Sequence, residues 1–100
     1  MTTYVLLIKF STEHAKNYAS MEQMGQEMRE KYMRACPGIK LLAHHLYLSG
    51  PYDFMHLYES PDVETAFKMS AVIRSSRMVS SCETWPAISY QKMLEVVKDL

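Results

Sequence analysis

The sequence predicts a single α+β domain, and the order of its elements is the main observation behind this prediction. Runs of strand length alternate with segments of helical periodicity in the order βαββαβ, followed by one more short helix. The 100 residues suit one domain, spanning residues 1–100, and 48% of them are hydrophobic, which is enough for a modest core. We therefore expect a ferredoxin-like fold: a four-stranded antiparallel sheet, two helices on one face, and a short C-terminal helix.

The first part of the chain is predicted to form a strand and then a helix. Residues 3–10 form an apolar run rich in β-branched and aromatic residues, which is typical of a central strand. From about Thr12 to Ala35 the apolar residues recur at three- and four-residue steps, and Pro37 with Gly38 ends this helix. The apolar stripe of the helix consists of Tyr18, Met21, Met24, Gly25, Met28, Tyr32 and Ala35.

A hairpin is predicted next. Residues 39–48 and 52–59 are both strand-like, and Ser-Gly-Pro at 49–51 favours a tight turn between them. A loop of two or four residues centred on this turn pairs residues whose numbers sum to 101, whereas an odd loop length would slip the register by one. The predicted pairs are His45 with His56, Tyr47 with Phe54, and Ala43 with Tyr58.

The rest of the chain repeats the helix and strand order. Ser60 followed by Pro61 marks the start of a helix that runs to about Ser75, because serine caps helices and proline fits the first helical position. Residues 78–88 are expected to form the fourth strand, and a short amphipathic helix after Ser89 needs a surface to cover. The stripe expected to be buried on the longer helix is Val63, Ala66, Phe67, Ser70 and Ile73.

The hairpin register also predicts which face of the sheet is bare. One side of the hairpin is aliphatic and suits packing against two helices. The other side carries the histidines and tyrosines, so we expect it to lack helices and to be covered by a second copy of the chain, closing a dimeric α/β barrel. The aliphatic side consists of Leu42, His44, Leu46, Leu48, Met55 and Leu57.

The candidate site lies on this predicted bare face. His45 and His56 would stand side by side, where two imidazoles can act as general acid and base or hold one metal ion. Three interpretations stay open: a dimer interface only, a small-molecule pocket, or a transition-metal or haem site with Glu83 as third ligand. His14 is expected at the surface. The candidate ligand-binding residues are Tyr47, Phe54, Tyr58, Tyr52 and Trp85.

Composition excludes several classes of function. Eleven basic and eleven acidic residues cancel, so a nucleic-acid partner is not expected. No apolar run reaches the roughly 20 residues that span a bilayer, so we expect a cytoplasmic protein with no membrane partner. Cys36 and Cys82 fit no metal or redox motif, and with only three glycines no phosphate loop is present. No metal or cofactor is therefore expected.

The hairpin carries a family resemblance. The segment Leu48–Phe54, with Gly50, Pro51, Tyr52 and Asp53 at its centre, resembles the GYD-domain family, which is named for a Gly-x-Tyr-Asp element. The likeness extends thinly over most of the chain. It implies the dimeric α/β-barrel superfamily, whose members include cofactor-free monooxygenases, isomerases, haem-handling enzymes and ligand-sensing domains. We expect the carboxylate of Asp53 to cap hairpin amides rather than to take part in catalysis.

Three functional hypotheses follow. The leading one is a homodimer that binds a small apolar or aromatic molecule, with cofactor-independent chemistry of the monooxygenase or isomerase type through His45 and His56. The alternative is a non-catalytic homo-oligomeric interaction or ligand-sensing module. The third is haem or metal binding through the same two histidines. The sequence does not decide whether the protein is an enzyme, because this superfamily hosts many reactions on one scaffold.

Overall fold

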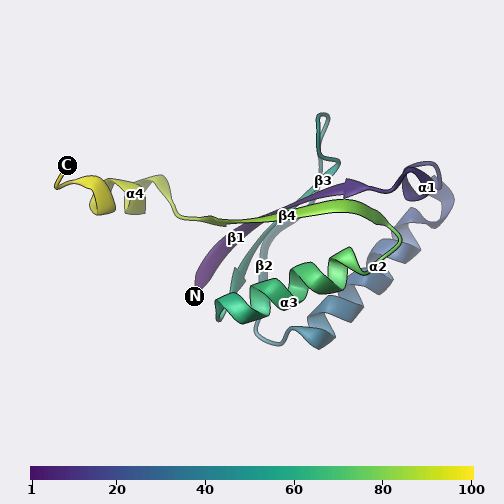
Figure 1. The fold of residues 1–100 in the computed structure, drawn as a ribbon, viewed down its shortest axis with the longest axis horizontal. Helices are drawn as coiled ribbons and strands as arrows, with labels where there is room; N and C mark the ends of the chain where they lie inside the picture. Colours follow the sequence, from purple (N-terminus) through teal and green to yellow (C-terminus); the bar gives the residue numbers. More distant parts are fainter.

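Four strands form one antiparallel sheet with the order β2-β3-β1-β4 in the computed structural model of the chain (Figure 1). Their bounds are Thr2–Phe10 for β1, Lys40–Tyr47 for β2, Phe54–Ser60 for β3 and Val79–Ala87 for β4. The apolar run predicted as a central strand is β1, which pairs with both β3 and β4. The structure describes residues 1–43 and 46–100. The predicted ferredoxin-like order of strands is confirmed.

Two long helices lie side by side on one face of this sheet (Figure 1). They are α2, Tyr18–Ala35, and α3, Val63–Arg74. A one-turn helix, α1, precedes α2 at Thr12–Ala15, and a short helix, α4, ends the chain at Tyr90–Val97. Because no helix covers the opposite face of the sheet in the described part of the chain, the two faces have different surroundings.

The predicted single helix from Thr12 is divided in the structure. Ser11 caps α1 by accepting the backbone N–H of His14 at 3.1 Å, and the chain turns at Lys16 and Asn17 before α2 begins. The predicted stop is confirmed, since α2 ends before Pro37 and Gly38 adopts a φ of 94°, which glycine reaches without a Cβ clash. The division moves His14 away from the axis of α2.

The start of α3 lies two residues later than predicted. Asp62, not Ser60, caps the helix, since its carboxylate accepts the Thr65 N–H at 2.7 Å. Hydrogen bonding by the Thr65 side chain, together with this backbone N–H, lowers the pKa of Asp62. The predicted buried stripe is partly wrong. Phe67 is 72% exposed and Val63 is also exposed. The buried set is Ala66, Met69 and Ile73, which are spaced by three and four residues.

The core lies between the sheet and these two helices. Its strand residues come from alternate positions of β1 and β3 and from Cys82 in β4, and its helix residues come from α2 and α3. Both cysteines are buried free thiols, and burial raises the pKa of each. The fully buried large side chains include Leu6, Tyr32, Tyr58, Met69 and Ile73.

The predicted assignment of the sheet faces is wrong. Pairing of Leu6 with His56, of Tyr4 with Tyr58 and of Ile8 with Phe54 places the aromatic and histidine residues of β3 on the face that the helices cover. Alternation along a strand separates two sets of side chains, but both sets here are apolar, so it does not show which set the helices cover. The apolar residues of the face without helices, called the open face below, are Val5, Leu7, Leu46, Met55, Leu57 and Trp85. Glu83 lies on the same face beside Leu7.

The predicted hairpin register holds only next to the turn. Tyr47 pairs with Phe54, as predicted, but Ala43 pairs with Leu57 and not with Tyr58. The reason is that the register shifts twice along β2, between Leu41 and Ala43 and again between Ala43 and Leu46. The predicted pairing of His45 with His56 is not tested, because His45 lies outside the described residues. His44 also lies outside them.

Asp53 joins the hairpin to the end of β1. Its carboxylate accepts the backbone N–H of Phe10 at 2.9 Å, and its own N–H donates to the carbonyl of Ile8 at 2.9 Å. Its carbonyl accepts the N–H of Leu48 at 3.0 Å, which closes the hairpin. The aspartate of the Gly-x-Tyr-Asp element therefore has a structural role, although it caps the end of β1 rather than the hairpin amides.

We expect Asp53→Ala to destabilise the fold by about 1–3 kcal/mol, because a charged acceptor of a partly buried N–H is removed. Urea unfolding followed by circular dichroism measures this loss. Asp99→Ala removes an exposed carboxylate near the C-terminus and should change stability by less than about 0.5 kcal/mol. Equal effects of the two substitutions would contradict the role given to Asp53.

Candidate functional site

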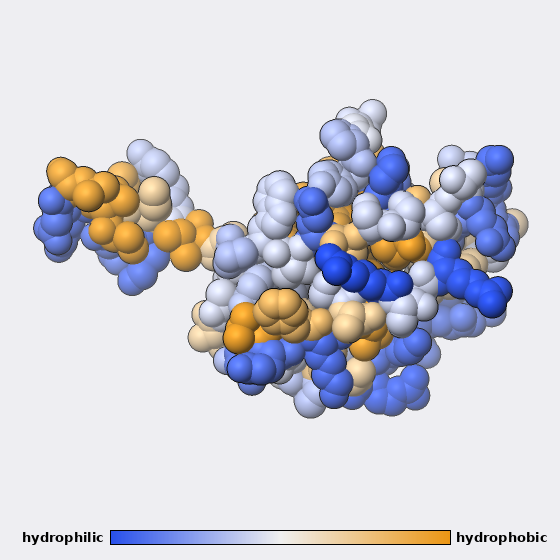
Figure 2. Space-filling view, viewed as in Figure 1, coloured by the Kyte–Doolittle hydropathy of each residue, from blue (hydrophilic) through white to orange (hydrophobic). Residues whose placement is uncertain are grey.

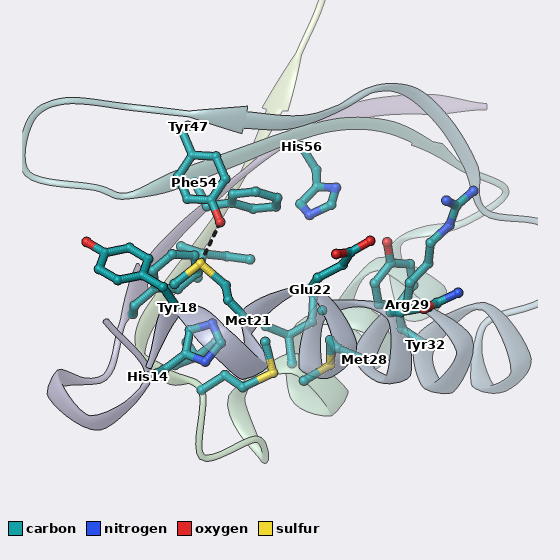
Figure 3. Close-up of a pocket in the computed structure, with 17 residues that line it drawn as sticks. His14, Tyr18, Met21, Glu22, Met28, Arg29, Tyr32, Tyr47, Phe54 and His56 are labelled. Atoms are coloured by element: carbon teal, nitrogen blue, oxygen red, sulfur yellow. Dashed lines mark hydrogen bonds between the residues drawn. The ribbon is translucent and has the colours of Figure 1, made fainter. Parts of the chain in front are cut away.

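A cavity of about 580 Å³, called the α2 cavity below, lies between α2 and the sheet (Figure 3). Its volume is within the range of about 300–1,000 Å³ that is usual for small-molecule sites. Strand side chains form one wall, and the stripe of α2 that faces the sheet forms the other. The apolar part of the lining is Ile8, Phe10, Met21, Met28, Phe54 and Ile73.

The sequence of α2 explains why a space remains there. Gly25 occupies the middle of the stripe that faces the sheet, and a Cβ at this position would meet no atom within 4 Å. Tyr47 bridges the hairpin and the helix, because its hydroxyl donates to the sulfur of Met21 at 2.8 Å (Figure 3). Its ring also meets Phe54 edge-on at 5.1 Å between centroids. These contacts hold α2 and the sheet apart at one end of the cavity.

His14 supplies a buried polar group at one end of the cavity. Its side chain is 2% exposed, and neither Nδ1 nor Nε2 has a hydrogen-bond partner among the described residues. The ring packs edge-on against Phe10 at 4.7 Å between centroids. Burial lowers the pKa of His14, because desolvation disfavours the imidazolium. A neutral imidazole presents one donor and one acceptor to the cavity.

Tyr32 supplies a second buried polar group at the other end. Its side chain is 2% exposed, and its hydroxyl has no hydrogen-bond partner among the residues that the structure describes. Burial raises the pKa of this phenol, and the nearby charge of Arg29 offsets part of that effect. Its ring meets His56 edge-on at 6.3 Å. His14 lies in α1 and Tyr32 lies near the end of α2, so the two polar groups stand at opposite ends of the lining.

Exposed side chains of α2 mark the mouth of the cavity. Tyr18, Glu22 and Arg29 line it and are all exposed to solvent (Figure 3). The charged side chains of the lining, Glu22 and Arg29, therefore lie at the mouth, while the buried polar side chains, His14 and Tyr32, are neutral. A ligand here meets an apolar interior with two separated hydrogen-bonding groups.

Three residues predicted from the sequence line this cavity. His56, Phe54 and Tyr47 project from the strands into it, on the face opposite to the one predicted (Figure 3). The tentative catalytic role of His56 and the ligand-binding roles of the two aromatic residues stay predictions. His45, the other predicted catalytic residue, lies outside the described residues.

The other predicted ligand-binding residues do not line the α2 cavity. Tyr58 is fully buried and stacks on Tyr4 at 5.5 Å between ring centroids. The Tyr52 hydroxyl donates to Glu83, which ties the hairpin to β4. Trp85 is 52% exposed on the open face. These three positions are structural or lie on the opposite surface.

The sequence interpretation missed His14, Tyr32 and Gly25 as cavity residues. It placed His14 at the surface, although His14 precedes Tyr18 by four residues and Met21 by seven, so it continues the helical stripe backwards. Extending that stripe would have indicated that His14 faces the sheet. Tyr32 and Gly25 were assigned to the stripe, but periodicity does not reveal whether a stripe packs tightly or leaves a space.

Neither a metal site nor a membrane-spanning helix is found among the described residues. No group of three or more His, Cys, Asp or Glu side chains in residues 1–43 and 46–100 is placed to hold a metal ion. Glu83, the predicted third ligand, accepts the hydrogen bond from Tyr52. In the same part of the chain, no helix combines the length and apolar character needed to cross a bilayer.

Comparisons with known proteins agree with this fold. Residues 4–97 match the family model of the GYD domain. The crystal structure of FFRP-DM1 is similar with a TM-score of 0.58 and 20% identity, over 88% of this chain and 100% of that one. The hypothetical protein PHS023 from Pyrococcus horikoshii has a TM-score of 0.57 and 19% identity, over 89% and 92% of the two chains. No curated protein is significantly similar in sequence.

We expect His14 to make the stability of the fold depend on pH. Its folded-state pKa lies below the ordinary value of 6.5, so the unfolded chain binds the proton more readily. The contribution of the neutral His14 to the free energy of unfolding is therefore fully present above about pH 6.5, and it is lost as the pH drops below this value. Urea unfolding at about pH 7.5 and about pH 5 should show a larger loss in the wild type than in His14→Phe. Equal losses in both proteins would contradict the burial of a neutral imidazole.

Proposed function

The chain belongs to the GYD domain family, and from this premise we propose that it binds a small, elongated, mainly apolar molecule in the α2 cavity. One observation carries the proposal: the cavity contains two buried polar side chains, His14 and Tyr32, that have no hydrogen-bond partner among the described residues. An unsatisfied buried polar group costs about 1–3 kcal/mol, and a ligand that bonds to it recovers that cost.

The chemistry of the lining indicates the class of ligand. Phe10, Phe54 and the thioethers of Met21 and Met28 suit an aromatic ring or a planar conjugated system. The neutral imidazole at the His14 end suits a hydroxyl or carbonyl group rather than a carboxylate, because Arg29, the cationic side chain of the described lining, lies near Tyr32 at the other end. The neutral phenol of Tyr32 also suits a hydroxyl or carbonyl group. The favoured ligand therefore has an aromatic middle and a hydroxyl or carbonyl group at each end.

The same residues fit cofactor-independent proton transfer on such a ligand. The imidazole of His14 is unprotonated at neutral pH and can accept a proton from a ligand hydroxyl, while the phenol of Tyr32 can donate one. In this proposal binding is the primary function, and any isomerase-like or oxygenase-like reaction uses these two groups rather than a metal.

Gly25→Leu tests the proposal by filling the cavity from α2. The new side chain enters open space, and replacing a helical glycine should leave the fold unchanged or more stable by up to about 1 kcal/mol. Binding of p,p′-biphenol, measured by calorimetry, should weaken at least about tenfold, which is 1.4 kcal/mol. Gly25→Ala should bind nearly as the wild type does.

Lys31→Leu is the matched control, since it adds the same side chain to the exposed side of α2, away from the cavity lining. It should leave the affinity for p,p′-biphenol unchanged. The proposal is wrong if Gly25→Leu binds as tightly as the wild type, or if the wild type prefers biphenyl p,p′-dicarboxylate over the diol.

The open face supports a second candidate function, self-association. Leu46 and Trp85 are exposed, and Val5, Met55 and Leu57 are partly buried. Apolar patches of this kind on a protein surface are commonly covered by a partner. We propose that the partner is a second copy of the chain, with the open faces of the two sheets towards each other. This arrangement keeps the α2 cavity of each copy on the outer, helical side.

We expect Leu57→Lys to weaken self-association at least about tenfold in sedimentation equilibrium, because the charge would lie in the centre of the open face. Phe67→Lys changes an exposed apolar side chain in the helical layer and should not alter the association. Circular dichroism checks that both variants are folded. A wild type that stays monomeric up to about millimolar concentration would contradict this candidate.

A further inference from the structure

The last residues of the chain form an arm that leaves the domain. After β4 the segment from Ile88 to Leu100, called the C-terminal arm below, projects beyond the sheet and carries α4 away from the core (Figure 1). Among the described residues, the side-chain hydrogen bonds of the arm are internal to it: Ser89 accepts the Lys92 N–H at 3.0 Å, and Lys92 meets Glu95 at 3.4 Å. Figure 2 shows apolar side chains gathered on this arm.

Helix α4 needs a surface to be stable. It has eight residues, and isolated helices shorter than about 12–15 residues are marginal in water even with a good cap. Its apolar residues follow helical spacing on one side, which is the pattern of a helix that packs against another apolar surface. This stripe consists of Tyr90, Met93, Leu94 and Val97, and the first three are exposed.

The accessible surface area of the chain indicates how large an interface with a partner would be. The accessible surface is 6884 Å², whereas a compact monomer of this mass exposes about 5,800 Å². The radius of gyration is 14.8 Å, and about 13 Å is usual for this length. An excess of about 1,000 Å² per chain, or about 2,000 Å² for two chains, equals a full protein–protein interface.

A second copy of the chain is a better partner for α4 than the open face of its own chain or an anionic membrane. Only Ile88 and Ser89 link β4 to α4, and this short, extended link directs the helix away from its own open face. The polar side of α4 has Lys92 and Lys98 against Glu95 and Asp99, so it lacks the basic excess of helices that bind anionic membranes. A two-fold pair lets each copy supply the helix that the other copy's open face lacks.

We propose that the C-terminal arm clasps a second copy of the chain, with the apolar stripe of α4 lying against the part of that copy's open face that the contact between the two sheets leaves uncovered. This inference rests on the proposed self-association and adds the element that completes it. The two copies exchange their arms, so apolar surface that is exposed in the single chain becomes buried in the pair.

Hydrogen–deuterium exchange of the full chain at low and high micromolar concentration tests the proposal, with sedimentation of the same samples. We expect the amides of α4 to become protected together with dimer formation. Leu94→Lys should weaken the dimer about tenfold and remove the protection of α4. Gln91→Lys introduces the same charge beside the stripe and should change neither, and Trp85 fluorescence provides an independent reading of burial on the open face.

Four results would overturn the inference. A dimer in which the α4 amides stay unprotected refutes the arm exchange and leaves the association of the open faces standing. A monomer with unprotected α4 at every concentration refutes both. Protection of α4 that does not depend on concentration means that the arm folds onto its own chain. Protection seen only with vesicles of phosphatidylcholine and phosphatidylglycerol means that α4 binds lipid.

Discussion

The sheet has two apolar faces, but its long helices cover only one of them, and the other features of the molecule depend on this asymmetry. The face under α2 and α3 carries Tyr4, His56 and Tyr58, and it encloses both the core and the α2 cavity. The open face carries the aliphatic side chains of β1 and β3, and no helix of the described chain covers it. The proposed ligand binding and the proposed self-association therefore use opposite sides of one sheet, so neither would obstruct the other.

The cavity results from a local departure from close packing. Gly25 leaves a space where most helices would place a side chain against the sheet, and Tyr47 supports the rim of that space through Met21. His14 and Tyr32 then remain buried without hydrogen-bond partners among the described residues. Because such groups destabilise a fold, their presence in a cavity of this size is the observation on which the proposed ligand binding rests.

The sequence was sufficient to predict the elements and their order, because periodicity, Pro37, Gly38 and Ser89 mark helices and their ends directly. It was not sufficient to predict the faces. The two sides of the hairpin are both apolar, and the register shifts along β2 cannot be read from turn length. His56, Phe54 and Tyr47 were therefore selected correctly as residues that lie near one another, but on the wrong side of the sheet. His14 was missed because the apolar stripe was followed only from Tyr18 onwards, although the same spacing extends back to His14.

In the proposed function, the α2 cavity holds a neutral His14 that has no hydrogen-bond partner among the described residues until a ligand binds. Nitrogen-15 NMR of the histidine side chains, with His14→Phe used to assign the signal, tests it directly at about pH 7 during titration with p,p′-biphenol. The account predicts a neutral His14 imidazole in the free protein and a change in both ring nitrogen shifts that saturates as the diol binds. A protonated His14 imidazole, or shifts that do not move while the diol binds, would contradict it.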